Sequence, residues 1–256
     1  MNAPKNGGIT KAWPHKEKLA QLERDLQSNY DIGRAAVDYK LTTGRWKWLY
    51  DAGGNLDSKR YTEEINKATP RNQSEIIAQH LTGTGLLPKN DADGNWLVSW
   101  RAKIQVACFI CCGAFSGMRV SELFELHEDS FHTYTINGQT FHSISAATHK
   151  LAAGRKKDEW LTSPIVEKAI SLAITLSSCA REQLVKLAAH SSDQGQVDTL
   201  LKISSNLWLS QYKRKNLPTL ISRTKWNDRL KNYAKSVGAI VDEHTLSECR
   251  QLNPRN

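Results

Sequence analysis

CCGAFSGMRVSELFEL, at residues 111–126, joins an apolar run to a new helix through a corner that contains Gly117. Beyond this corner stand Arg119 and, three positions later, Glu122. Residues three apart are neighbours on a helix, so the two side chains are placed to form a salt bridge. The planar fork of an arginine is equally suited to bind a phosphate through two parallel hydrogen bonds. The corner is therefore a candidate site as well as a structural element.

The residues on both sides of the corner predict a mainly helical domain with a small sheet. Upstream, residues 99–117 have the apolar pattern of a buried central helix. Downstream, residues 131–150 alternate in polarity around Asn137 and Gly138, the strongest short signal for a hairpin. A third strand is expected at residues 159–162, before a helix that starts at Pro164. We therefore expect an α+β fold, mainly α with an antiparallel three-stranded sheet.

The N-terminal residues predict further helices. Leu19, Leu22 and Leu26 recur at helical spacing, which indicates an amphipathic helix of about four turns. A second helical stretch follows, and then DAGGN at residues 51–55 predicts a turn. Beyond the turn, Thr62 is placed to cap a helix with acidic residues in its first turn. We place a boundary near residue 57, between a basic helical region (1–57) and the main domain (58–256).

The charge and composition of the chain indicate which classes of molecule it can bind. The chain has 35 Lys and Arg against 26 Asp and Glu, a net charge of +9. This balance favours a polyanion, nucleic acid before a membrane surface, although a merely basic soluble protein has the same composition. No run approaches the roughly 18 apolar residues that span a bilayer, and the N-terminus lacks the apolar core of a signal peptide. We expect a cytoplasmic protein, associated with the nucleoid when bound to DNA.

The positions of the cysteines predict a role in core packing rather than in metal binding or redox chemistry. Cys108 and Cys111 form a CxxC, but no second Cys or His pair stands beside them at the spacing of a metal site. Their apolar neighbours would bury both sulfur atoms. We therefore expect reduced thiols and no bound metal.

Two segments combine basic and aromatic residues. Arg45 and Lys47 alternate with Trp46 and Trp48, a pattern that suits DNA contact or packing of the indoles onto the next helix. The densest basic segment, residues 212–231, suits a solvated helix face or contact with phosphates. The candidate DNA-binding residues in these segments are Arg45, Lys47, Lys213, Arg214, Lys215, Arg223 and Lys225.

The order of these features resembles that of tyrosine recombinases of the phage integrase family. The resemblance is carried by the corner GMRVSEL, the strand hairpin with its basic turn, and HTL at residues 244–246. It implies that Arg119 contacts the scissile phosphate and that Glu122 supports it. It also implies a hairpin lysine for proton transfer, Lys150, with Lys156 and Lys157 as alternatives.

These residue types suit phosphodiester chemistry without a metal or cofactor. Attack on the phosphate places negative charge on its non-bridging oxygens, which a bidentate arginine stabilises. A lysine beside the leaving oxygen supplies the proton that the departing group needs. The expected reaction class is phosphodiester transesterification in DNA integration and recombination.

The C-terminal residues depart from the family pattern. His244 stands at the position of the family's catalytic histidine, but Ser247 replaces the second arginine, and no tyrosine follows Tyr233. A phosphotyrosine mechanism needs that nucleophile. We therefore expect a truncated, catalytically incomplete integrase that binds double-stranded DNA and can self-associate on it.

Two other classes of function stay open. The missing arginine and tyrosine favour a DNA-binding regulator without enzymatic activity. A helical protein-interaction module is the third class, and it requires that the chain fail to bind DNA at low salt.

Overall fold

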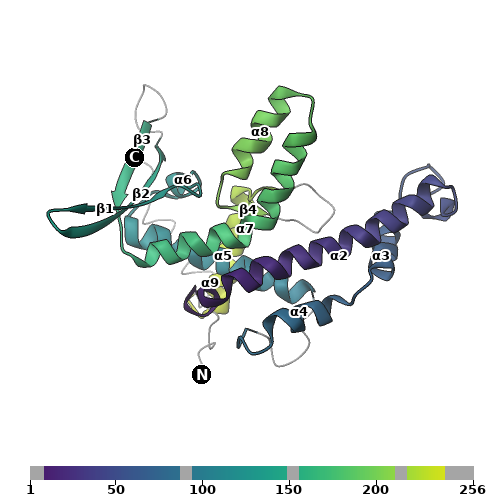
Figure 1. Ribbon diagram of the computed structural model, residues 1–256, viewed down its shortest axis with the longest axis horizontal. Helices are drawn as coiled ribbons and strands as arrows, with labels where there is room; N and C mark the ends of the chain where they lie inside the picture. Colours follow the sequence, from purple (N-terminus) through teal and green to yellow (C-terminus); the bar gives the residue numbers. More distant parts are fainter. Residues whose placement is uncertain (1–8, 87–93, 149–155, 211–217, 240–256) are drawn as a thin grey trace.

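The fold is mainly helical with a small antiparallel three-stranded sheet, which confirms the predicted class (Figure 1). The computed structural model describes residues 9–86, 94–148, 156–210 and 218–239. The helices described are α1 (Ile9–Ala12), α2 (Lys16–Thr42), α3 (Ser58–Ala68), α4 (Gln73–Leu81), α5 (Gly94–Ser116), α6 (Val120–Leu123), α7 (Ile165–His190), α8 (Gln194–Ser204) and α9 (Arg223–Ser236), with 3-10 turns η1 (Trp13–His15) and η2 (Lys47–Leu49). The strands are β1 (Phe131–Ile136), β2 (Gln139–Thr148), β3 (Lys156–Leu161), β4 (Leu209–Ser210) and β5 (Thr219–Leu220).

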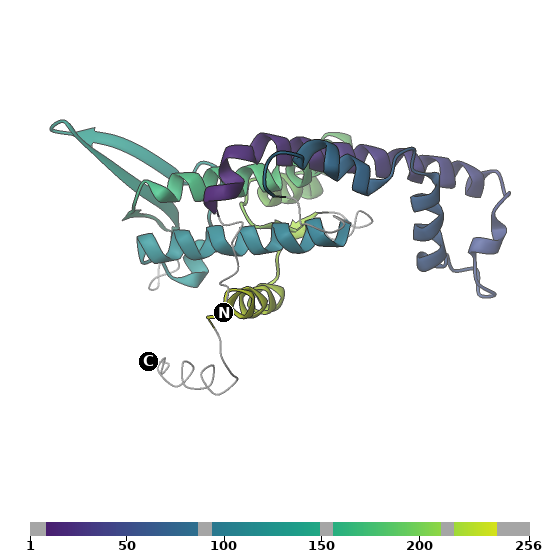
Figure 2. The same ribbon diagram turned by 90° about the horizontal axis from the view of Figure 1, so that it is seen from below.

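The predicted central helix is α5, and the main core forms around it. Figure 2 shows α2 and α7 in one layer above α5, with α9 below it. Leu19, Leu22 and Leu26 of α2 are buried in this core, together with Ile104 and Cys108 of α5. The predicted apolar stripe of the N-terminal helix is therefore confirmed, and the helices that pack on it are α4 and α7.

α2 is longer than expected, because the two helical stretches predicted before residue 51 form one helix of 27 residues. Its second half packs on α3 in a separate small core with Tyr30, Val37, Leu49 and Ile65. Gly33 allows this approach, since a Cβ there would lie 2.7 Å from the carbonyl oxygen of Ile65. Both cores include residues on each side of position 57. The boundary proposed there remains a prediction.

The start of α3 differs from the prediction that Thr62 caps it. Asp57 is the N-cap, and its side chain accepts hydrogen bonds from the backbone N–H groups of Lys59 and Arg60. Thr62 lies in the second turn, and its hydroxyl donates to the carbonyl of Ser58. The side chain of Asp57 satisfies the first free N–H groups of the helix, so the helix begins five residues earlier than Thr62 would place it.

The three-stranded sheet has the order β1-β2-β3, with both pairs antiparallel. The predicted two-residue turn joins β1 to β2 with positive φ at Asn137 (50°) and Gly138 (78°). The third strand begins earlier than predicted, at Lys156, and ends at Leu161. A second sheet of two short strands, β4 and β5, was not predicted, because two-residue strands carry too little periodicity to be recognised.

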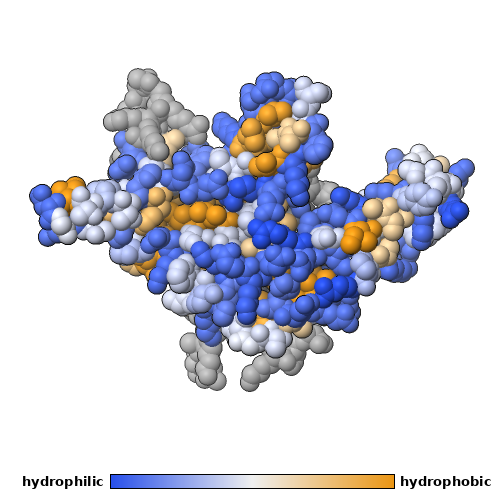
Figure 3. Space-filling model, viewed as in Figure 1, coloured by the Kyte–Doolittle hydropathy of each residue, from blue (hydrophilic) through white to orange (hydrophobic). Residues whose placement is uncertain are grey.

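The face of the molecule seen in Figure 3 is mostly hydrophilic, with small separate apolar patches. One described stretch, Leu97–Ser116 of α5, is long and apolar enough to cross a membrane by length and composition alone. It shares this property with the core helices of soluble proteins, and α5 is the helix around which the main core forms.

Candidate nucleic-acid interface

The predicted corner is present between α5 and α6. Gly117 has a φ of 68°, a left-handed conformation that glycine adopts without steric cost. The backbone N–H of Arg119 donates to Oε2 of Glu122 at 2.7 Å, and Glu122 is 4% exposed. The carboxylate of Glu122 therefore fixes the backbone of Arg119, the N-cap residue of α6.

The side chain of Arg119 is exposed, and among the described residues its guanidinium takes part in no ion pair. The salt bridge that the three-residue spacing suggested is replaced by the bond from Glu122 to the Arg119 amide. A charged fork on a fixed backbone is thus presented to solvent, where a phosphate could bind it through two hydrogen bonds.

Residues just before β4 donate hydrogen bonds to the end of the short helix α6. The indole N–H of Trp208 donates to the carbonyl of Leu123 at 2.6 Å, and Nδ2 of Asn206 donates to the carbonyl of Phe124 at 2.8 Å. A Cβ at Gly113 would lie 2.9 Å from Leu123, so α6 packs tightly on the end of α5. The free carbonyls at the end of α6 are thereby satisfied, and the orientation of the corner is fixed.

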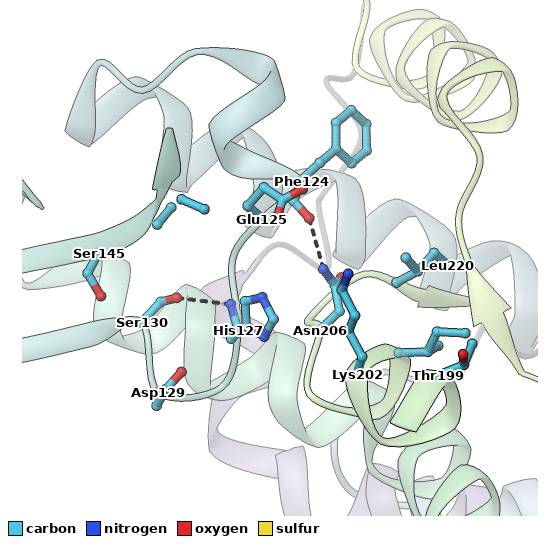
Figure 4. Close-up of a pocket in the computed structure, with 13 residues that line it drawn as sticks. Phe124, Glu125, His127, Asp129, Ser130, Ser145, Thr199, Lys202, Asn206 and Leu220 are labelled. Carbon is cyan, nitrogen blue, oxygen red and sulfur yellow. Dashed lines mark hydrogen bonds between the residues drawn. The ribbon is translucent and has the colours of Figure 1, made fainter. Parts of the chain in front are cut away.

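An aromatic cluster joins the corner to α9, which carries part of the predicted basic segment. The ring centroids of Phe124 and Trp226 are 5.9 Å apart, and Phe109 lies 4.7 Å from Trp226. Figure 4 shows Phe124 pointing away from the cleft below it, toward α9. Because Trp226 is in the first turn of α9, Arg223 and Lys225 lie on the helix that packs directly on the corner, and both are exposed.

Another arginine of the same segment has a structural role. Arg229 donates to Oε1 of Gln105 at 2.9 Å, and Gln105 in turn donates to the carbonyl of Leu209. Burial, with the nearby charge of Arg101, lowers the pKa of Arg229 to about 10. Arg229 is therefore occupied in the packing of α9 on α5.

The candidates Arg45 and Lys47 lie away from the corner. Both are exposed beside η2, at the end of α2 that is remote from α6 and the sheet in Figures 1 and 2. Trp46 packs against the small core, with Nζ of Lys40 4.2 Å from its ring centroid, whereas Trp48 is 49% exposed. Packing thus accounts for Trp46, and the structure does not bring Arg45 and Lys47 together with Arg119.

Several predicted site residues lie outside the described residues: Lys150, Lys213, Arg214, Lys215 and His244. The alternatives to Lys150 are at the start of β3, where Lys156 pairs with Thr148 in the register of the sheet. β2 packs against α6, so the connection from β2 to β3 follows a strand that contacts the corner helix.

A cleft of about 800 Å³ lies between the segment that follows α6 (residues 124–130), β2 and α8 (Figure 4). Its charged lining residues are of both signs, Glu125 and Asp129 against Lys202. Nδ1 of His127 lies 2.8 Å from the hydroxyl of Ser205 and is occupied by that contact. This cleft was not predicted, because its two walls are more than fifty positions apart along the chain.

The cysteines of the described residues are buried and free, as predicted. Burial raises the pKa of the Cys108 and Cys112 thiols, which keeps them protonated and unreactive. Within the described ranges no group of His, Cys, Asp and Glu has a geometry that could hold a metal ion.

Comparisons with protein-family models, with curated proteins and with solved structures give no match for this chain.

Proposed function

We propose that the chain binds double-stranded DNA through the surface formed by the α5–α6 corner and the first turn of α9. In this proposal the protein is of the site-specific integrase type and acts in DNA integration and recombination. The observation that carries the proposal is the exposed guanidinium of Arg119 on a backbone that buried Glu122 holds in place.

Electrostatics and packing support this surface. Arg223 and Lys225 are exposed on the helix whose Trp226 contacts Phe124, so a neighbouring helix presents two further cations to solvent. Their helix is anchored by Trp226, which is 1% exposed. Cations on a fixed backbone suit phosphates that are spaced regularly along a duplex, and their binding releases condensed counterions. The net charge of +9 adds attraction at longer range.

Titration of a fluorescent duplex at several salt concentrations tests the proposal. We expect R119A to weaken binding about tenfold, or about 1.4 kcal/mol, and to reduce the slope of log affinity against log salt by about one. R34A is the matched control, because Arg34 is also exposed and lies on α2. Equal losses in the two variants would mean that only net charge matters, which would exclude a specific role for the corner.

A second function, DNA binding without strand cleavage, is favoured by Ser247 at the position of the family's second arginine. Nicked suicide substrates separate the two functions. A covalent adduct between DNA and these 256 residues would establish strand transfer, whereas binding without any adduct would favour the regulator.

A further inference from the structure

The hairpin formed by β1 and β2 projects from the body of the molecule (Figures 1 and 2). Residues 131–148 contain no Asp, Glu, Lys or Arg, although the whole chain carries 61 such residues, 35 basic and 26 acidic. Two cross-strand ring pairs stiffen the hairpin, Phe131 with His142 and Tyr134 with Phe141. A rigid ribbon without charge thus extends from a strongly basic protein.

The two edges of the sheet differ in a way that affects pairing with other chains. β3 has the sequence KKDEWL, and consecutive charges on an edge strand oppose pairing with another chain. β1 has the sequence FHTYTI, without charge or proline and rich in β-branched and aromatic residues. In Figures 1 and 2 no described element runs along the outer side of β1. β1 is therefore the edge that is open to another strand.

The hydrogen-bond pattern shows which groups of β1 face outward. Ser145 donates its backbone N–H to the carbonyl of Ser130 at 2.8 Å, so positions 130, 132, 134 and 136 bond to β2. In an antiparallel ladder the alternate residues direct their N–H and C=O groups to the other side. The outward groups are those of Phe131, Thr133 and Thr135.

We propose that the β1 edge pairs with β1 of a second copy of this chain, antiparallel and with the two-fold axis at Thr133. This register places Thr133 opposite Thr133 of the partner, Phe131 opposite Thr135, and His132 opposite Tyr134. It aligns all three outward-facing residues of each copy as hydrogen-bonded pairs. The arrangement makes one continuous sheet of six strands.

The charge distribution makes the β1 edge the place where a second copy meets least repulsion. Two copies of a chain with net charge +9 repel each other, and the repulsion is weakest where the contacting surface is neutral. No like charges face each other in the proposed register, and threonine and aromatic pairs across strands are stabilising. Thr133 is exposed, and its hydroxyl lies 3.0 Å from Nδ1 of His142, so its side chain is already ordered.

Sedimentation equilibrium over a range of protein concentrations, without DNA, tests the pairing. We expect a monomer–dimer equilibrium in the wild type. T133K should weaken it at least about tenfold, because two lysines then face each other at the axis. T140K is the matched control, since Thr140 is an exposed threonine of the same hairpin on β2. A monomeric wild type, or equal dimerisation of T133K, would overturn the proposal.

Disulfide trapping tests the register independently. T133C should give a covalent dimer on oxidation, because Cα atoms of a hydrogen-bonded antiparallel pair are about 5.5 Å apart. T135C should not, since the two copies of residue 135 are offset by four residues, or about 14 Å. The wild type shows any background from its native cysteines. Equal trapping of both variants, or trapping of neither, would overturn the register.

Discussion

The backbone and the side chain of Arg119 face different surroundings. The amide is bonded to a buried carboxylate, whereas the guanidinium is exposed. The spacing of Arg119 and Glu122 could be recognised in the sequence, but a salt bridge and a backbone bond give the same spacing. The distinction depends on the β-like backbone of Arg119, with φ −72° and ψ 153°, which turns its amide toward Glu122.

Glu122 provides a test at this scale. We expect E122A to lower the free energy of unfolding by about 1 kcal/mol, because it removes the acceptor of the half-buried backbone N–H of Arg119 at the start of α6. E122Q keeps an acceptor oxygen at that position and should lose less. Urea denaturation of the two variants beside the wild type measures both effects. Equal stability of E122A and the wild type would mean that the Glu122 bond does not hold the corner.

Among the elements, α3 shows how a helix start is decided locally. Asp57 and Thr62 are both acceptable caps by residue type. Asp57 takes the role because it directly follows the turn at residues 51–55, and its carboxylate reaches two backbone N–H groups. Thr62 becomes an interior residue of the same helix. The N-cap residue of a helix can be predicted only together with the turn that precedes the helix.

The cap makes a contribution to stability that depends on pH. Hydrogen bonds from the backbone N–H groups of Arg60 and Lys59 lower the pKa of Asp57 below its ordinary value of 3.8. A carboxyl group with a lowered folded pKa stabilises the fold above its unfolded pKa and loses that contribution as pH falls through the folded value. We therefore expect the wild type to be more stable than D57A at neutral pH, with the difference shrinking below about pH 4.

Thermal unfolding of both proteins between neutral and acidic pH measures this difference. T62A is the control, because Thr62 carries no ionisable group and caps no N–H. A difference between wild type and D57A that is constant with pH would contradict the cap.

At the scale of the whole molecule, α2 connects two cores. Its first half packs with α4 and α7, and its second half packs with α3. A buried ion pair ties α2 to α5, with Oε1 of Glu23 2.7 Å from Arg101 and the two side chains 8% and 10% exposed. Arg229 adds a second positive charge nearby. The carboxylate of Glu23 therefore offsets the positive charge of Arg101 and Arg229 where little water is present.

We expect E23Q to lower stability by about 1–3 kcal/mol, because a charge-assisted hydrogen bond to Arg101 becomes a weaker neutral one in a poorly hydrated place. Replacing both residues, in E23L/R101M, should cost less than E23Q, since apolar side chains need no compensation. Guanidinium denaturation of the single and double variants gives both values. A double variant less stable than E23Q would contradict this interpretation of the pair.

The features that depend on neighbouring residues could be predicted from the chain alone. The hairpin at Asn137 and Gly138, the apolar helix before Gly117 and the mainly helical class follow from turn chemistry and periodicity, which act over a few positions. Which basic residues share a surface is a matter of packing between distant segments. Phe124 and Trp226, about a hundred positions apart, bring α9 to the corner. Because α2 is 27 residues long, Arg45 lies far from the corner. A hydrogen bond to Gln105 holds the side chain of Arg229 against α5. No local pattern encodes these contacts, because each depends on two surfaces that meet only in the folded chain.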